Sequence, residues 1–424
     1  MSRFIDGLPL AQAQALIQAR LACVAPERAV GLSDALGLVA SRPVLAPAPL
    51  PAFARSTVDG YAVHSLDTFG AEEGSPALLV IDGEILMGRA ETAPLPFGAA
   101  RHMPTGGMLP PAADAVVMVE HCEAIDEQTV LVHKRVAPGE NVVQAGEDVP
   151  AAQRLLAAGR RIRPEDIGLL AACGVRSVFV RVPLRVGILS TGDELVEADR
   201  PLQPGEIRDS NRPMLAALLR EAGAEIVDYG IVRDAADALA ATLAQAVQAC
   251  QLVLLSGGSS MGQRDYAAET IDGLGPPGVV VHGLAIKPGR PTIVGFAGKV
   301  PVFGLPGHPA AAMTVFRLLV APVLRQLCGA QADAAPLFSA RLTRNVASAP
   351  GRDDFVSVRL VKRADGLWAE PVFGRSGLLS VMTEADGVLH IPSASGGCYG
   401  GAWVEVTAHR WEEAMRGEEG DAKR

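Results

Sequence analysis

The stretch Leu252-Val-Leu-Leu-Ser-Gly-Gly-Ser-Ser-Met-Gly-Gln-Arg-Asp-Tyr266 decides the fold that this sequence predicts. Its first four residues are apolar without alternation, which is typical of a parallel strand buried on both faces. The strand runs directly into Ser256-Gly257-Gly258-Ser259. Glycines at that point let backbone N–H groups approach a ligand, because no Cβ stands in the way. Open α/β sheets bind their ligands at the carboxyl ends of such strands.

Two further apolar runs end in polar loops that also carry glycine. Residues 184–190 lead into Thr191-Gly-Asp-Glu194, and residues 300–304 lead into Leu305-Pro-Gly-His-Pro309. Between and after these runs, apolar periodicity predicts helices over 213–222, 235–249 and about 309–327. Strands and helices that alternate in this way predict a doubly wound, Rossmann-like α/β domain over residues 182–330.

The flanking sequence predicts further domains, since 424 residues are too many for one hydrophobic core. Short strand patterns separated by Gly/Pro turns predict an inserted β module, a small barrel or sandwich. Alternating patterns near the end of the chain predict a C-terminal β domain. The expected boundaries are 1–45 with 143–181 for a mixed α/β N-terminal domain, 46–142 for the inserted β module, 335–410 for the C-terminal β domain and 411–424 for a disordered tail.

Composition excludes several classes of protein. A net charge of −9 and an aromatic content of 4% argue against a nucleic-acid-binding protein. The six cysteines form no Cys-x-x-Cys pair, which argues against a zinc site or a disulfide framework. No basic, apolar leader and no uninterrupted apolar run of membrane-spanning length occur, so we expect no membrane association and a cytoplasmic location.

Acidic side chains follow several of the predicted strands. Asp193 and Glu194 follow the first strand, Asp234 precedes the helix predicted from 235, and Asp265 follows the glycine-rich loop. Each has an ordinary structural explanation: helix N-terminal acids, a helix N-cap and a loop acid, respectively. Several carboxylates at one sheet edge are also what Mg²⁺ uses, with oxygen ligands and retained waters.

Two cations flank a Pro-Gly turn in Ile286-Lys287-Pro-Gly-Arg290-Pro291. A solvated turn explains them, but a rigid turn that holds both charges together also suits an oxyanion or phosphate. The sequence has no Walker motif, which disfavours an ATPase of that class. His308 is more simply a helix-start residue than a base, and Asp59-Gly60 and Thr105-Gly106 read as turns.

An ordered set of short motifs, spread over roughly residues 5–408, resembles the MoeA/gephyrin family of molybdopterin molybdenumtransferases. The matching residues are Thr57-Val-Asp-Gly-Tyr-Ala-Val63, Thr105-Gly106, Ser190-Thr-Gly-Asp-Glu-Leu195, Asp209-Ser-Asn211, Ser256-Gly-Gly258 with Asp265-Tyr266, Ala285-Ile-Lys-Pro-Gly289, Gly304-Leu-Pro-Gly307, Gly351-Arg352 with Phe355, and Ser376-Gly377. Each motif alone is weak, whereas their common order is specific.

The resemblance implies an L-shaped, four-domain homodimer that ligates molybdate to the dithiolene of adenylylated molybdopterin, assisted by Mg²⁺, and releases AMP. It implies Mg²⁺ ligands at Glu194, Asp234 and Asp265, and catalytic residues at these three, Lys287 and Asp59. Asp59 and Thr105 match residues that the family supplies from the partner subunit. Substrate-binding residues are implied at Thr105, Ser190, Thr191, Gly192, Asn211, Ser256, Gly257, Gly258, Gly289, Arg290, Pro306, Gly307, Arg352 and Ser376.

Further partners implied are a molybdopterin adenylyltransferase and a recipient apo-molybdoenzyme. The chain departs from the family pattern at three positions. Val58 stands where methionine is common, His308 where asparagine is common, and Gly283 where a second basic residue is common, with His282 beside it. The alternatives are a CinA-like nucleotide-processing hydrolase, a tungstate-using paralogue and a non-catalytic scaffolding paralogue.

Overall fold

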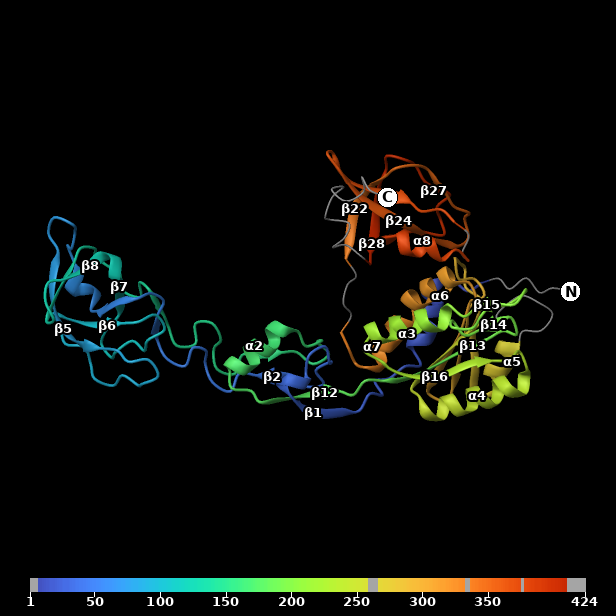
Figure 1. The fold of residues 1–424 in the computed structure, drawn as a ribbon, viewed down its shortest axis with the longest axis horizontal. Coiled ribbons are helices and arrows are strands. Elements are labelled where there is room, and N and C mark those ends of the chain that lie inside the picture. The colour runs from blue at the N-terminus through green and yellow to red at the C-terminus, as the bar shows by residue number, and fades with distance from the viewer. Residues whose placement is uncertain (1–6, 258–265, 332–335, 375–376, 410–424) are drawn as a thin grey trace. The chain divides into compact units, whose positions relative to one another are not determined.

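The computed structural model of the chain describes residues 7–257, 266–331, 336–374 and 377–409 (Figure 1). The chain forms two compact units. One contains residues 1–28, 37–41 and 181–424, and the other contains residues 29–36 and 42–180. The predicted disordered tail, residues 411–424, lies outside the described residues.

The first unit contains the predicted α/β domain, built on a six-stranded sheet. In spatial order its strands are β16 (Glu225–Val232), β13 (Arg185–Thr191), β17 (Leu252–Ser256), β21 (Val300–Leu305), β20 (Ile293–Ala297) and β18 (Pro277–His282). The first four are parallel, as predicted, whereas β20 runs antiparallel to both of its neighbours. The two residues that join β20 to β21, Gly298 and Lys299, are too few for the crossover that a parallel pair needs.

Helices cover both faces of this sheet (Figure 1). The helical elements on one face are α1 (Leu10–Gln18), α3 (Asn211–Glu221), α6 (Pro309–Val315), the π-helix Phe316–Val320 and α7 (Ala321–Leu327). The other face carries α4 (Ala236–Ala249) and α5 (Tyr266–Gly273). Successive residues of β17 feed the two cores alternately, Leu254 one and Leu255 the other. This accounts for the uninterrupted apolar run in the sequence.

Within the described residues, the segment Pro309–Leu327 is the one helix long and apolar enough to cross a membrane by length and composition. Half of its most apolar window is buried inside the structure. Its residues Val315, Leu319 and Val320 belong to the core cluster under the sheet. A core helix of a folded domain therefore explains its composition.

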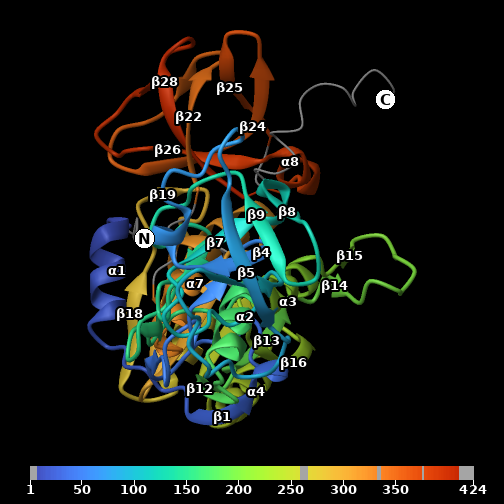
Figure 2. The same ribbon diagram turned by 90° about the vertical axis from the view of Figure 1, so that its left-hand side faces the viewer.

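The predicted C-terminal β domain is a small β barrel (Figure 2). Its strands are β22 (Leu337–Leu342), β24 (Asp353–Arg363), β25 (Gly366–Pro371), β26 (Gly387–Ile391) and β28 (Trp403–Ala408). The ring closes because β24 pairs with both β25 and β26. Smaller elements are the β23 (Val346–Ala347) and β27 (Gly397–Cys398) pair and α8 (Leu379–Glu384).

The second unit carries a six-stranded sheet of β7 (Ala115–Met118), β4 (Gly60–Val63), β6 (Ala99–Met103), β5 (Ala77–Glu84), β9 (Thr129–Val132) and β8 (Cys122–Ala124). Val63 and Val117 enter one hydrophobic cluster, whereas Ala62 and Val116 enter another, so both faces of the sheet are covered.

The remaining part of this unit brings together segments that are distant in the sequence. The strand pairs are β1 (Glu27–Gly31) with β12 (Ser177–Arg181), β2 (Val44–Leu45) with β11 (Arg154–Leu156), and β3 (Arg55–Ser56) with β10 (Val142–Val143). Helix α2 (Pro164–Ala172) begins with a proline and two acids in its first turn. The short 3₁₀ helices span Leu32–Asp34, Ser65–Thr68 and Val119–His121.

Phe303, at the centre of the α/β sheet, offers a test of this core. Its side chain is fully buried, so we expect Phe303→Ala to lower the free energy of unfolding by about 3–5 kcal/mol. The measurement is urea denaturation followed by circular dichroism. Phe69→Ala is the control, since Phe69 is 84% exposed. Equal unfolding midpoints for the two variants would contradict the assigned core.

Candidate active site

The loops after β13, β17 and β21 meet at one edge of the α/β sheet. The Asn211 side-chain amide, in the first turn of α3, donates to Ser256 Oγ and to the Gly307 carbonyl oxygen, each at 2.8 Å. Gly257 has φ +93°, and a Cβ there would overlap the Thr191 carbonyl oxygen. Only glycine fits this position, because the backbones that follow β13 and β17 touch there.

Two buried polar atoms at this edge have no hydrogen-bond partner in the described part of the chain. They are Ser190 Oγ and Asn211 Oδ1, in side chains that are 0% and 6% exposed. Buried polar groups are almost always paired in folded proteins, so unpaired ones call for an explanation, such as a ligand or water. Both atoms lie where the sequence predicted substrate contacts.

Hydrogen bonds hold two of the predicted acids at this edge, Asp234 and Asp193. Thr191 Oγ1 donates to Asp234 Oδ1 at 2.6 Å, and the Asp234 backbone N–H donates to Asp193 Oδ1 at 3.3 Å. The Asp234 side chain therefore faces the end of β13 and does not cap α4, whose N-cap residue is Ala235. Glu194 is exposed, and its carbonyl oxygen accepts from Ile207 N–H.

Two of the expected site residues near these acids, Gly258 and Asp265, lie outside the described residues, as does Ser376. Across the described ranges, no three His, Cys, Asp or Glu side chains gather closely enough to hold a metal ion by themselves.

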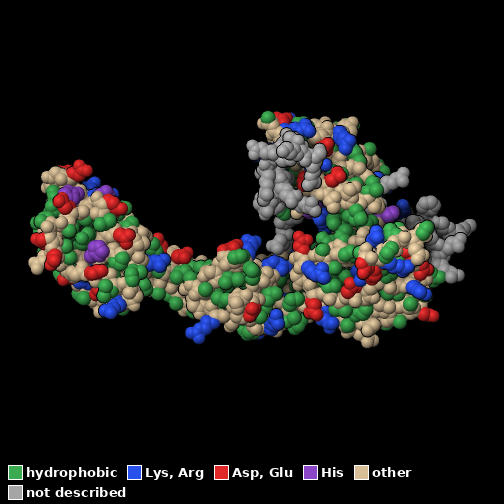
Figure 3. Space-filling model, in the orientation of Figure 1, with side chains coloured by type: hydrophobic (Ala, Val, Ile, Leu, Met, Phe, Trp, Pro, Cys, Tyr) green, Lys and Arg blue, Asp and Glu red, His purple; other side chains and the backbone are tan. Residues whose placement is uncertain are grey.

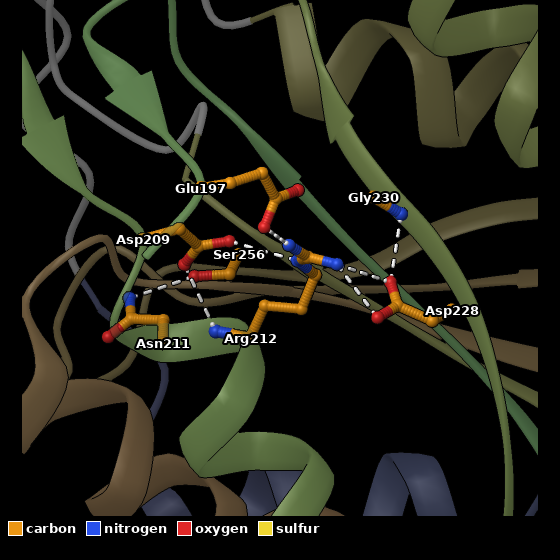
Figure 4. Close-up of polar contacts among 7 residues, drawn as sticks. All are labelled: Glu197, Asp209, Asn211, Arg212, Asp228, Gly230 and Ser256. Atoms are coloured by element: carbon orange, nitrogen blue, oxygen red, sulfur yellow. Dashed lines mark hydrogen bonds and ion pairs between the residues drawn. The ribbon is translucent and has the colours of Figure 1, made fainter. Parts of the chain in front are cut away.

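A cluster of charged residues beside this edge was not predicted from the sequence (Figure 4). Arg212, one residue after Asn211, forms ion pairs with Glu197, Asp209 and Asp228. Although burial by itself lowers the pKa of Arg212, hydrogen bonds and charge interactions with these carboxylates raise it above its usual value. The sequence offered one signal for this cluster, the stretch Asp209-Ser-Asn-Arg212, whereas Glu197 and Asp228 lie 15 and 16 residues from Arg212.

A cavity of about 850 Å³ lies between the α/β domain and the C-terminal barrel. The predicted site residues that line it are Lys287, Gly289, Arg290, Pro306 and Arg352. His308 also lines it and is the N-cap residue of α6, which agrees with its predicted place at a helix start. The structure thus brings together cations that are up to 65 positions apart in the sequence, Lys287 and Arg352.

The cavity is electropositive. Arg352 Nε donates to Asp354 Oδ1 at 3.0 Å, so the buried Asp354 carboxylate offsets one cation. Lys287 is exposed and makes no ion pair with any residue in the described ranges. The described lining thus carries three cationic side chains, Lys287, Arg290 and Arg352, and one carboxylate, Asp354, a composition that suits a small anion.

A short strand holds the two walls of the cavity in register. Strand β19 (Ile286–Lys287) pairs in parallel with β24, placing Lys287 opposite Asp354. Nearby, Gly283 has φ +86°, a conformation that side chains rarely adopt, and its N–H donates to Thr292. The local backbone therefore explains glycine at this departure from the family pattern.

A second cavity, of about 410 Å³, also lies against α6, but none of the predicted site residues line it. Basic groups such as Arg317 and Arg325 line part of it. His409, also in its lining, has its pKa lowered to about 4 by burial and by the charge of Arg317. The larger cavity is therefore the candidate site.

Asp59 and Thr105 lie in the other compact unit, where the structure brings them together. The Thr105 backbone N–H donates to Asp59 Oδ1 at 2.7 Å. This hydrogen bond, followed by one from the Thr105 side chain and by the charge of His102, lowers the pKa of Asp59 below its ordinary value. Asp59 is thus an exposed carboxylate that stays ionised at neutral pH.

On the face drawn in Figure 3, basic and acidic side chains are interspersed over the α/β domain. This distribution differs from the one-sided basic surface of a typical nucleic-acid-binding domain.

Comparison with family models covers most of the chain. Residues 8–174 match the MoeA N-terminal region (domain I and II), residues 187–326 match a probable molybdopterin binding domain, and residues 339–408 match the MoeA C-terminal region (domain IV).

Similar proteins agree with these matches. A molybdopterin molybdenumtransferase 2 of Mycobacterium tuberculosis is 34% identical over 86% of this chain and 90% of its own length. A molybdopterin molybdenumtransferase of Bacillus subtilis is 32% identical over 90% of each chain. A crystal structure of a molybdopterin biosynthesis MoeA protein from Pyrococcus horikoshii superposes with a TM-score of 0.82, at 30% identity, over 95% of this chain and 100% of that chain.

Gly257 tests the contact between the loops at the sheet edge. We expect Gly257→Ala to lower the free energy of unfolding by more than the roughly 1–2 kcal/mol that a left-handed residue costs, because the Cβ overlaps the Thr191 carbonyl oxygen. Urea denaturation measures this difference. Gly275→Ala is the matched control, since Gly275 also has positive φ, at +107°, but nothing lies within 4 Å of its Cβ position. Equal losses in both variants would show that backbone conformation alone matters at Gly257.

Proposed function

This chain belongs to the MoeA family of molybdenum cofactor biosynthesis, as a molybdopterin molybdenumtransferase, and we propose that it inserts molybdate into adenylylated molybdopterin with Mg²⁺-assisted release of AMP. The observation that carries this proposal is the electropositive cavity lined by Lys287 and Arg352, to which the loop after β21 contributes Pro306 and His308.

The cavity supplies the groups that the oxyanion requires. Molybdate is a dianion, and cationic side chains outnumber carboxylates among the described lining residues. Lys287 is exposed on the short strand β19, where it can reach an anion, and Arg352 is fixed in orientation by Asp354. A cation fixed in place before substrate binds, as Arg352 is by Asp354, stabilises negative charge without reorganising during the reaction.

The strand ends supply buried polar side-chain groups. Ser190 Oγ and Asn211 Oδ1 have no hydrogen-bond partner among the described residues. Gly257 lets the backbones meet there, and its N–H donates to the Leu305 carbonyl oxygen at 3.3 Å. We infer that Ser190 and Asn211 contact the pterin or the phosphates of the adenylylated substrate, because buried polar groups are almost always paired.

The carboxylates at the sheet edge fit Mg²⁺ by their chemistry. Mg²⁺ usually takes one or two carboxylates together with substrate phosphates and waters, so Glu194 and Asp234 suffice as protein ligands with Asp265 as a third. Both described acids are exposed, and Thr191 fixes Asp234 through one carboxylate oxygen. When bound, Mg²⁺ would polarise the phosphoanhydride and shield its charge.

The direct test measures AMP release from adenylylated molybdopterin with Mg²⁺, with and without molybdate, followed by reconstitution of an apo-molybdoenzyme. Release that depends on molybdate and yields active enzyme supports the transferase. Release that ignores molybdate indicates a hydrolase or another oxyanion, in which case tungstate is tested next. Absence of release would contradict the proposal.

Lys287 is the most informative single residue in this assay. We expect Lys287→Ala to reduce molybdate-dependent AMP release by roughly 10²–10³-fold, the usual loss when one fixed anion-stabilising donor is removed. Lys299→Ala is the control, because Lys299 lies in the β20–β21 turn of the same domain and does not line the cavity. Similar rates for the two variants would exclude Lys287 from the site.

Asp59 tests whether the site is shared between two subunits. We propose a homodimer in which Asp59 and Thr105 of one subunit complete the site that contains Lys287 of the other. Asp59→Ala and Lys287→Ala should each be inactive alone. After unfolding and refolding as a mixture, about a quarter of wild-type activity should return, because half of the random dimers contain one intact site of two. A mixture as inactive as its components would place both residues in one subunit's site.

A further inference from the structure

Arg212 binds three carboxylates that come from three separate segments (Figure 4). Its Nη1 donates to both oxygens of Asp228, at 2.8 and 2.7 Å, and its Nε donates to Asp209 Oδ2 at 3.1 Å. Its Nη2 donates to Glu197 Oε2. The Arg212 side chain is only 12% exposed. A guanidinium whose three nitrogen atoms each donate to a different carboxylate fixes its partners more firmly than a single surface ion pair does.

Two of these contacts hold residues 192–210, an excursion of the chain between β13 and α3 that carries Glu194. After β13 the chain leaves the sheet and returns to α3, and the two halves of this excursion pair as β14 (Leu195–Val196) and β15 (Ile207–Arg208). Glu194 immediately precedes β14, and Glu197 immediately follows β14. Asp209 follows β15. Arg212 therefore ties both strands of the excursion to the first turn of α3.

The third contact holds the segment that carries Asp234. Asp228 lies on edge strand β16, and its Oδ1 also accepts from Gly230 N–H at 2.9 Å. Gly230 has φ +74° and lies where the pairing of β16 with β13 shifts register. Strand β16 continues from this bend to Val232, two residues before Asp234. One guanidinium thus connects the segments of both described candidate metal ligands, Glu194 and Asp234.

We propose that Arg212 is a positioning residue that sets the separation of the Glu194 and Asp234 carboxylates, and through it the affinity of this edge for a divalent cation. This inference rests on the metal site of the proposed function. Arg212 itself contacts neither carboxylate in the described structure; it acts through the excursion and through β16.

The sign of the effect distinguishes positioning from simple electrostatics. Arg212 carries a positive charge close to the proposed site. Removing that charge would tighten cation binding if its field were all that mattered, because like charges repel. Loss of positioning predicts the opposite, since removing a group that orients metal ligands weakens metal binding, by roughly 10–100-fold where that group bonds the ligands directly.

The experiment titrates the purified full-length protein with Mn²⁺, a stand-in for Mg²⁺, and measures free Mn²⁺ by electron paramagnetic resonance. We expect Arg212→Gln to bind Mn²⁺ about tenfold more weakly than wild type. Arg212→Lys should recover part of the loss, because one ion pair remains available to it. Arg200→Gln is the matched control. Arg200 pairs with Glu206 at 2.9 Å, and because both residues belong to the excursion, this pair does not tie it to α3 or β16.

Unchanged or tighter Mn²⁺ binding by Arg212→Gln would overturn the inference, as would an equal loss in Arg200→Gln. Should Arg212→Gln fail to fold, Arg212→Lys keeps the positive charge but loses the planar fork, so weaker Mn²⁺ binding by Arg212→Lys than by wild type would still report loss of positioning. Glu194→Gln and Asp234→Asn locate the metal. Wild-type Mn²⁺ binding by those two variants would overturn the proposed metal site itself, and this inference with it, which differs from a failure confined to Arg212.

Discussion

The parallel alignment of β13, β17 and β21 determines where chemistry can occur in this chain. Their carboxyl ends share one edge of the sheet, and the backbones that follow β13 and β17 approach so closely that Gly257 has no room for a Cβ. The Asn211 amide then connects the loops after β17 and β21. Every residue proposed to contact the nucleotide or pterin depends on this arrangement, because loops alone do not fix polar groups in register.

The second structural constraint is the pairing of β19 with β24. A strand of two residues joins the α/β domain to the barrel and sets Lys287 opposite Asp354. Asp354 in turn orients Arg352. The cationic cavity is therefore an outcome of strand register between two domains, and a shift of one residue would turn Lys287 to the other face. Precise placement matters here because fixed charges act on an anion only where their geometry is set in advance.

Much of the α/β domain could be predicted from the sequence, since buried parallel strands such as Leu252–Ser256 carry an apolar run that ends in glycine. The sequence also indicated Lys287 and the strand-end acids as candidates. It could not indicate β19, because two residues show no periodicity, nor the antiparallel turn between β20 and β21. The Arg212 cluster was missed for a different reason: Glu197 and Asp228 read as ordinary surface acids until the fold brings them to one guanidinium.

The acidic and the cationic side chains of the site belong to two different regions, and the loop after β21 connects them. Acids collect at the ends of β13 and β16, whereas cations line the cavity beside the barrel. The loop after β21 contributes to both, since the Gly307 carbonyl accepts from Asn211 while Pro306 and His308 line the cavity. On the proposed reaction, a phosphoanhydride would lie toward the acids with its divalent cation, and the oxyanion would lie toward Lys287. Each anionic group would then be neutralised by a different cation, the phosphoanhydride by the divalent ion at the acids and the oxyanion by Lys287 and Arg352.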